Sequence, residues 1–333
     1  MVTIKDVAKE AGVAISTVSN VLNHVDVVSE EKKQRVIAAV EKLRYVPNMN
    51  AKLLKSSRKN TIGLFLTSVQ GDFYRVLIQT IHMQCRMKGY LLNIYISNEN
   101  TGDEIYSMII ASGVEGAIVL NERLQEEYIN RLAMTKLPMV FIDREFKGTR
   151  MSSVVINNHE GATLAMEYLI KQGHRRIGYF HGIEGFDDRD RFHAYLDTMN
   201  KYNLPIDESI IFKGYFEEAV AYSEMRVLLL KGTSLPDAFF CANDEMAFGC
   251  IHALTEAGLR VPEEVCVVGF DDILLSAYYN PPLTTIHSPV NELGNQSTAE
   301  LLRLMELEET AGGTVIKLSP SMVIRDTCKV RLS

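Results

Sequence analysis

The chain has 333 residues, 47% hydrophobic and 23% charged, which is typical of a soluble globular protein of two or three domains. No apolar run reaches the roughly 18 residues of a membrane span, and the first residues lack the apolar core of a secretory signal, so we expect a cytoplasmic protein without a membrane partner. Five cysteines without a Cys-x-x-Cys pair favour reduced core thiols, and no Cys/His group has metal-ligand spacing, so neither a metal nor a cofactor is expected.

Charge is unevenly distributed along the chain. Residues 1–60 contain 11 Lys or Arg against 6 Asp or Glu, whereas the remaining residues contain 24 against 36. A small basic segment followed by an acidic body is typical of a protein whose first domain meets a polyanion. The imbalance is modest, so a basic surface that is merely solvated is the alternative.

The first 47 residues predict three short helices around one small core. Thr3 and Asp6 form a capping pair for the first helix, and Gly12 supplies the turn that ends it. A second helix is expected over residues 15–23, and a third begins after Ser29. The apolar residues that recur at helical spacing are Ile4, Val7, Ala8, Ala11, Val18, Val21, Leu22, Val36, Ala39, Val40 and Leu43.

The outer face of the second helix carries short polar side chains and almost no charge, where a surface helix usually carries Lys and Glu. These residues are Ser16, Thr17, Ser19, Asn20 and Asn23. Hydroxyl and amide groups suit base edges and phosphate oxygens in a major groove, which admits a helix. The pattern indicates a helix-turn-helix DNA-binding domain. The alternative is a helical cap whose polar face binds no partner.

Residues 48–60 are polar and basic and lie between this domain and the rest of the chain. A flexible, solvated linker is the simpler interpretation of the Ser, Arg, Lys and Asn residues in this segment. However, Leu53 and Leu54 together present apolar surface that has no obvious partner within an isolated linker. This favours a segment with a function of its own.

From residue 61 onward, short apolar runs alternate with helical segments, which indicates parallel sheets built from βαβ units. The order of these runs also repeats along the chain. "NTIGLFL" resembles "RRIGYFH", "EGAIVL" resembles "DAFFCA", and "LPMVFID" resembles "VCVVGFD". We therefore expect two similar α/β halves that face one another across a cleft, with a ligand bound at the carboxyl ends of their strands.

Polar residues follow several of these runs directly. They are Asp143, Asn157, Asn243, Asp244, Asp271 and Asp272. Each one alone is a common helix cap, but several acceptors that converge on one cleft, together with an arginine and aromatic rings, suit a polyhydroxylated ligand.

Two stretches, "TIKDVAKEAGVAISTVSNVLN" and "VSEEKKQRVIAAVEKLRYVPN", resemble in register the DNA-binding domain of the LacI/GalR (lactose-repressor) family of transcription regulators. "GHRRIGYF", "CANDEMAFG" and "VGFDD" resemble further signatures of that family, so the resemblance covers essentially the whole chain. It implies a small all-α helix-turn-helix head and an α/β body of two similar parallel-sheet subdomains, like that of periplasmic binding proteins.

The same resemblance implies three domains. Residues 1–47 would bind DNA, residues 48–60 would form a hinge helix, and residues 61–333 would bind the effector and dimerise. Within the last domain, subdomain one is expected at about 61–158 and 292–321, and subdomain two at about 159–291 and 322–333.

By this resemblance, Ile15, Ser16 and Asn20 occupy the main base-reading positions. Thr17, Ser19 and Asn23 would lie nearer the phosphates, and Thr3 is a further DNA-binding candidate. Asn20 stands where Arg is commoner, and Ile15 is apolar where polar residues are frequent, so the operator need not match a relative's.

The segment after the head matches the family's hinge pattern Pro-Asn-x-x-Ala-Arg-x-Leu. The matching residues are Pro47, Asn48, Ala51 and Leu54, while Lys52 stands where Arg is usual. In relatives this segment becomes a helix on the operator, and the leucine wedges between bases in the minor groove. The resemblance therefore adds Lys52 and Leu54 to the DNA-binding candidates.

The effector site implied by the resemblance draws on both halves of the body. Its candidates are Phe73, Tyr74, Asn157, Arg191, Phe240, Asn243 and Asp271. Arg191 matches an Arg-Leu-x-Gly-Phe arginine, although Ala194 replaces the glycine and Arg189 offers a competing register. His174, in "GHRRIGYF", is interpreted as a structural residue.

Together these features predict a homodimeric transcription regulator, a repressor, that binds a palindromic operator and is controlled by a small ligand. A sugar or sugar phosphate is the expected effector, and a purine near Phe73 and Phe240 is the alternative. An enzyme is not expected, because no dinucleotide-binding, P-loop or Gly-x-Ser-x-Gly motif follows a strand. An exported sugar-binding protein is disfavoured by the helix-turn-helix head and by the lack of a signal sequence.

Overall fold

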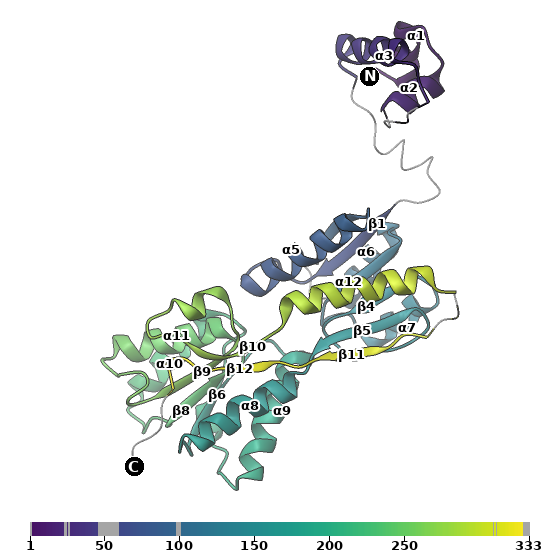
Figure 1. Cartoon of the computed structure of the whole chain (residues 1–333). Helices are drawn as coiled ribbons and strands as arrows, with labels where there is room; N and C mark the ends of the chain where they lie inside the picture. Colours follow the sequence, from purple (N-terminus) through teal and green to yellow (C-terminus); the bar gives the residue numbers. More distant parts are fainter. Residues whose placement is uncertain are drawn as a thin grey trace. The chain divides into compact units, whose positions relative to one another are not determined.

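The computed structural model describes residues 2–22, 25, 27–45, 60–97, 101–308, 310 and 312–328. The chain divides into two units, Met1–Lys59 and Asn60–Ser333, which are drawn in Figure 1. The predicted hinge at 48–60 lies outside the described residues except for its last residue, Asn60.

The first unit contains the three predicted helices, α1 (Ile4–Ala11), α2 (Ile15–Leu22) and α3 (Glu30–Leu43). The backbone N–H of Thr3 and its hydroxyl both donate to Asp6 Oδ2, at 2.8 and 2.7 Å, which fixes the start of α1. Gly12 ends α1 with φ of 62°, a left-handed conformation that favours glycine. Val7, Val18 and Val36, one from each helix, are fully buried at the centre of the shared core.

The second unit begins with a six-stranded parallel sheet in the order β11-β5-β4-β3-β1-β2. Its strands are β1 (Thr61–Leu66), β2 (Leu91–Ile96), β3 (Gly116–Leu120), β4 (Met139–Phe141), β5 (Met151–Ile156) and β11 (Val315–Leu318). Its helices are α5 (Asp72–Met87), α6 (Gly102–Ser112), α7 (Glu126–Ala133) and α12 (Val290–Glu306).

Helices cover both faces of this first sheet, which explains why its inner strands are continuous apolar runs. On one face, Leu64 of β1 packs with Ile81 of α5 and Leu301 of α12. On the other face, Phe65 of β1 packs with residues of α6 and α7, such as Ile109. In Figure 1, α5 and α12 lie over the same side of the sheet, although more than 200 residues separate them.

A second six-stranded sheet follows, in the order β12-β10-β9-β8-β6-β7. Its strands are β6 (Ile177–His181), β7 (Ile211–Lys213), β8 (Ala238–Cys241), β9 (Cys266–Asp271), β10 (Thr284–His287) and β12 (Ser321–Val323). All of them pair in parallel except β12, which runs antiparallel to β10. Its helices are α8 (Asn158–Lys171), α9 (Phe186–Lys201), α10 (Glu218–Leu230) and α11 (Asp244–Glu256).

The two sheets place corresponding strands in the same order, because β2-β1-β3-β4-β5 corresponds to β7-β6-β8-β9-β10. The predicted fold class, a helical head with two similar parallel-sheet subdomains, is therefore confirmed. The chain passes between the sheets three times, after β5, after β10 and after β11. Within the described ranges no helix has the length and apolarity that crossing a membrane requires.

Helices α10 and α11 pack so closely that a side chain at Gly249 would collide with the neighbouring backbone. A Cβ there would lie 2.2 Å from the carbonyl oxygen of Glu218 and 2.9 Å from the nitrogen of Tyr222. We therefore expect Gly249→Ala to lower the free energy of unfolding by about 1–3 kcal/mol in urea titrations. Gly312→Ala is the control, because nothing lies within 4 Å of its Cβ position, and a change within about 0.5 kcal/mol is expected there. Equal stability of the two variants would contradict the close packing.

Candidate functional site

A cleft opens where the carboxyl ends of the strands of both sheets meet within the second unit. It consists of two adjoining cavities, of about 310 and 600 Å³, that share wall residues such as Asp143 and Asp188. The segments that follow strands of the first sheet, including the start of α5, contribute Gln70, Asp72, Phe73, Tyr74, Glu122, Arg123 and Asp143 to the smaller cavity. The segments at the carboxyl ends of the second sheet, including the N-terminal parts of α9 and α11, contribute Asp187, Asp188, Arg191, Phe216, Asn243, Glu245 and Asp271.

Arg191 lies at the base of this cleft and is 4% exposed. Its Nε donates to Asn158 Oδ1 at 2.8 Å, and one terminal nitrogen donates to the carbonyl oxygen of Ala242. The guanidinium carbon lies 3.7 Å from the ring centroid of Phe270, and the other terminal nitrogen is 3.8 Å from Asp271 Oδ1. These contacts hold the fork of donors in one orientation, so Arg191 offers a preorganised positive group.

Carboxyl groups dominate the remaining walls. Burial raises the pKa of Asp187 to about 7; the charge of Arg191 opposes this rise, while the carboxylates of Asp143 and Asp271 add to it. Burial likewise raises the pKa of Asp271 to about 6, against the lowering effect of Arg191. Asn158 Nδ2 donates to Asp187 Oδ1 at 2.7 Å, so one amide contacts both the arginine and the acid. At neutral pH the cleft therefore holds carboxyl groups that are only partly ionised.

Asp143 and Asp188 are two acids of the cleft that have partners within the protein. Arg144 donates to both oxygens of Asp143, from Nε at 3.0 Å and from a terminal nitrogen at 2.7 Å. Asp188 accepts from the backbone of Gly182 at 2.8 Å and lies 2.9 Å from His181 Nδ1. Both carboxyl groups are thus already paired, and they offer fixed acceptors in the wall that the two cavities share.

Five of the seven predicted effector residues line the smaller cavity: Phe73, Tyr74, Arg191, Asn243 and Asp271. Phe73 and Tyr74 meet edge to face with ring centroids 5.6 Å apart, and the Tyr74 hydroxyl lies 3.3 Å from Thr67 Oγ1. Burial raises the pKa of Tyr74 to about 12, so its hydroxyl remains a hydrogen-bond donor. Residues far apart in the sequence are therefore brought to one cavity, from both sides of the cleft.

The other two predicted residues lie elsewhere. Phe240 is fully buried, one residue before the end of β8, and meets Tyr179 with ring centroids 5.5 Å apart. Asn157 caps α8, because its side chain accepts from the backbone of Glu160 at 3.3 Å. Neither residue lines the cavities, so the structure places Phe240 in the core and gives Asn157 a capping role. Arg189, the competing register for Arg191, is exposed and lines the larger cavity.

Several cleft residues were absent from the predicted set. Glu122 and Phe216 have no strand-end or family signal as plain as that of Asp271, because they lie in the loops that follow β3 and β7. Asp187 lacks such a signal because it lies in the first turn of α9. Phe216 supplies an aromatic wall that sequence reasoning had assigned to Phe240. Asp143 was recognisable as a strand-end acid, but its pairing with Arg144 was not foreseen.

Contacts also join the two subdomains across the cleft. The backbone N–H of Leu274, after β9, donates to Asp72 Oδ2 at the start of α5 at 3.1 Å. Close by, a Cβ at Gly71 would lie 3.0 Å from Glu245 Oε1. The cleft is thus bridged at one edge, so a change in the angle between the subdomains must alter these contacts.

Comparison with known proteins identifies the architecture. Residues 3–48 match the family described as bacterial regulatory proteins, lacI family, and residues 166–328 match a periplasmic binding protein-like domain. The chain is 35% identical to the HTH-type transcriptional repressor PurR of Pasteurella multocida (strain Pm70) over 337 residues, covering 100% of both chains. The chain belongs to the lacI family. It is accordingly a DNA-binding transcription regulator with a ligand-binding body, and not an enzyme.

Solved structures of lacI-family proteins resemble the chain over nearly its whole length. The lac repressor dimer bound to operator and the anti-inducer ONPF superposes with a TM-score of 0.81 at 27% identity, covering 98% of both chains. The transcriptional regulator CelR–cellobiose complex has a TM-score of 0.73 at 26% identity, covering 98% of this chain and 100% of that one.

In this lacI-family regulator, α2 carries most of the predicted DNA contacts. Ile15 is 42% exposed and Ser16 is also exposed, whereas Thr17, Ser19 and Asn20 are half-buried beside the core residue Val18. Thr3 caps α1 and is exposed. The remaining predicted contacts lie outside the described residues; they are Asn23, Lys52 and Leu54.

His174 was interpreted as structural, and it is buried at the opposite, amino end of the second sheet. There it lies beside Cys266 and Cys328, and the ligand atoms of all three are within 4.8 Å of one another. Sequence spacing did not reveal this group because its members come from three distant segments.

The raised pKa of Asp187 predicts a pH dependence of stability. The pKa of Asp187 is about 7 in the folded protein and about 4 in the unfolded chain. Between these two pH values Asp187 is protonated in the folded protein but ionised in the unfolded chain, so the free energy of unfolding falls as the pH rises through this interval. We expect Asp187→Asn to make this fall less steep between pH 5 and pH 7, by up to about 1.4 kcal/mol per pH unit, in urea titrations. Asp103→Asn, an exposed site at the start of α6, is the control. Parallel pH profiles for wild type and Asp187→Asn would show that Asp187 is ionised throughout.

Proposed function

We propose that the protein is a homodimeric repressor in the cytoplasm, which binds a palindromic operator through its head and a small effector in the cleft. The observation that carries this proposal is that five residues predicted to bind effector, from segments at the carboxyl ends of both sheets, line one cavity. The lac repressor dimer bound to operator and the repressor PurR, both similar over nearly the whole chain, support the DNA-binding half of the proposal.

Effector and operator would be coupled through the angle between the subdomains. A ligand that contacts Phe73 on one side and Arg191 on the other favours one angle, because it binds best where both walls reach it. In a dimer, that angle sets the distance between the two segments 48–60, and so whether both can order on the minor groove. The coupling is reciprocal, so operator DNA changes effector affinity by the same factor.

The charge of the cleft narrows the expected effector class. Nine carboxyl side chains line the smaller cavity, against the two guanidinium groups of Arg123 and Arg191. Such a wall repels a sugar phosphate but offers many acceptors to hydroxyl groups. We therefore propose a neutral polyhydroxylated effector, a carbohydrate, and the cellobiose complex of the related CelR is consistent with this class.

A purine is the second candidate. Phe73 and Phe216 both line the cavity, so the cleft offers aromatic surface on each of its two sides. A flat heterocycle can stack on such rings, while the carboxyl groups accept hydrogen bonds from its N–H groups.

A ligand screen combined with substitution of Arg191 tests the proposed site. Neutral sugars, sugar phosphates and purines are added to the full-length protein, and we expect only neutral sugars to raise the melting temperature. Arg191→Ala should abolish this shift and the effect of the sugar on operator binding, while leaving operator affinity without effector largely intact. Arg226→Ala is the control, because Arg226 is an exposed arginine of α10 that lines neither cavity. A normal response in Arg191→Ala would remove that residue from the site, and a shift with purines alone would favour the second candidate.

For the DNA-binding half, we propose that Ser16 and Asn20 contact base edges and that Leu54 wedges into the minor groove. Leu54→Ala should weaken binding to the specific operator at least tenfold, because the kinked duplex is no longer stabilised, while binding to unrelated DNA changes little. Fluorescence anisotropy at a fixed salt concentration measures both affinities. Equal losses on both DNAs would contradict the wedge.

A further inference from the structure

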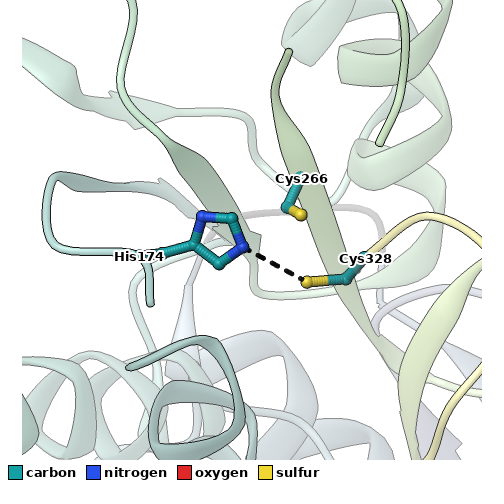
Figure 2. Close-up of side chains that lie close together, drawn as sticks. All are labelled: His174, Cys266 and Cys328. Atoms are coloured by element: carbon teal, nitrogen blue, oxygen red, sulfur yellow. Dashed lines mark hydrogen bonds between the residues drawn. The ribbon is translucent and has the colours of Figure 1, made fainter. Parts of the chain in front are cut away.

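Three potential metal ligands meet in the interior of subdomain two, away from the cleft. His174 precedes β6, Cys266 is the first residue of β9, and Cys328 follows β12, yet Figure 2 shows the imidazole and both thiols gathered around one point. Their exposed fractions are 3%, 1% and 2%. Cys328 Sγ and His174 Nε2 are 3.8 Å apart.

Backbone hydrogen bonds hold the two cysteines in register. The N–H of Val267, next to Cys266, donates to the carbonyl oxygen of Thr327, next to Cys328, at 3.0 Å. The Thr327 hydroxyl donates in return to the Val267 carbonyl oxygen at 2.7 Å. These paired bonds fix the backbone of the two cysteines side by side before any ion binds.

Asp237 links the loop that contains His174 to the start of β9. Its carboxylate accepts from the backbone N–H groups of Arg175 and Arg176, the residues after His174, at 2.9 and 3.0 Å. Its carbonyl oxygen accepts from the N–H of Cys266 at 3.0 Å. The histidine loop and the start of β9 are therefore joined through a single residue.

The separations suit a small thiophilic ion. Zinc binds thiolate sulfur at about 2.3 Å and imidazole nitrogen at about 2.0–2.1 Å, so two such ligands at tetrahedral to trigonal angles lie about 3.5–3.8 Å apart. The 3.8 Å between Cys328 Sγ and His174 Nε2 equals the upper end of this range. The remaining pairs, within 4.8 Å, require an inward shift of about 1 Å or less.

We propose that His174, Cys266 and Cys328 bind one Zn²⁺ ion. Two thiolates and one neutral imidazole balance the charge of the ion, which a buried site requires. On binding, the two thiols lose their protons to solvent, each sulfur forms a bond to zinc, and no electron is transferred. Among the described residues no fourth His, Cys, Asp or Glu joins the group, so a carbonyl oxygen or a water completes the coordination.

Such an ion would stabilise subdomain two without contacting the effector. Cys266 begins β9 and Asp271 ends it at the cleft, so the two sites lie about 17 Å apart at 3.3 Å per residue. Zinc would join the segment that follows β12 to the centre of the sheet, at the edge remote from the effector.

The experiment uses full-length protein, reduced, loaded with Zn²⁺ during expression and then dialysed without chelator. We expect about one zinc per chain by elemental analysis, and a melting temperature several degrees above that of chelator-treated protein. Cys328→Ser should bind less than a tenth as much zinc and lose the shift. Cys85→Ser is the matched control, since Cys85 is an equally buried free cysteine in α5, and it should retain both.

Co²⁺ provides a readout on wild-type protein that does not depend on whether a variant folds. Binding at this site should produce thiolate-to-cobalt charge-transfer absorption that Zn²⁺ abolishes. Substoichiometric zinc together with no charge-transfer band would overturn the proposal, as would equal zinc binding by Cys328→Ser. Binding of Cu⁺ but not Zn²⁺ would overturn the choice of ion.

Discussion

The geometry of the cleft depends on the contacts that the buried guanidinium of Arg191 makes. It joins the crossing segment at Asn158, the end of β8 at Ala242 and the end of β9 at Asp271, while its flat face lies on Phe270. A charge at 4% exposure is stable only with such partners, and each partner is in turn oriented by the arginine. The cleft floor is therefore one connected polar network.

Carboxyl groups give the cleft its chemical character. Because Asp187 and Asp271 have raised pKa values of about 7 and about 6, the walls act partly as hydrogen-bond donors and partly as acceptors near neutral pH. Polyhydroxylated ligands use both kinds of partner, whereas a phosphate meets an excess of negative charge. The same groups link ligand binding to proton uptake, because a neutral ligand that excludes water raises these pKa values further.

In subdomain two, the proposed effector site and the proposed zinc site lie at opposite ends of the strands. The carboxyl ends carry the proposed effector residues, and the group of His174, Cys266 and Cys328 lies at the opposite end of the sheet. A stabilising contact at that end would strengthen the sheet and leave the carboxyl ends free to respond to ligand. The hydrogen bond from Leu274 to Asp72 joins the two subdomains whose angle the effector is proposed to set.

The sequence alone determined which segments form helices and which form strands, because periodicity and capping act within a few residues. Helical spacing predicted the core positions Val7, Val18 and Val36, and continuous apolar runs predicted the strands. The family resemblance added the topology. What lines the cleft was decided by tertiary structure. Phe240 stands one residue before its strand ends, between helix-covered faces, so it is core, whereas Phe216 lies in a loop beyond β7 and reaches the cavity. His174 and the two cysteines come from segments more than 60 residues apart. They meet only because the fold places the amino ends of β6 and β9 beside the segment that follows the antiparallel strand β12, a proximity that no local pattern records.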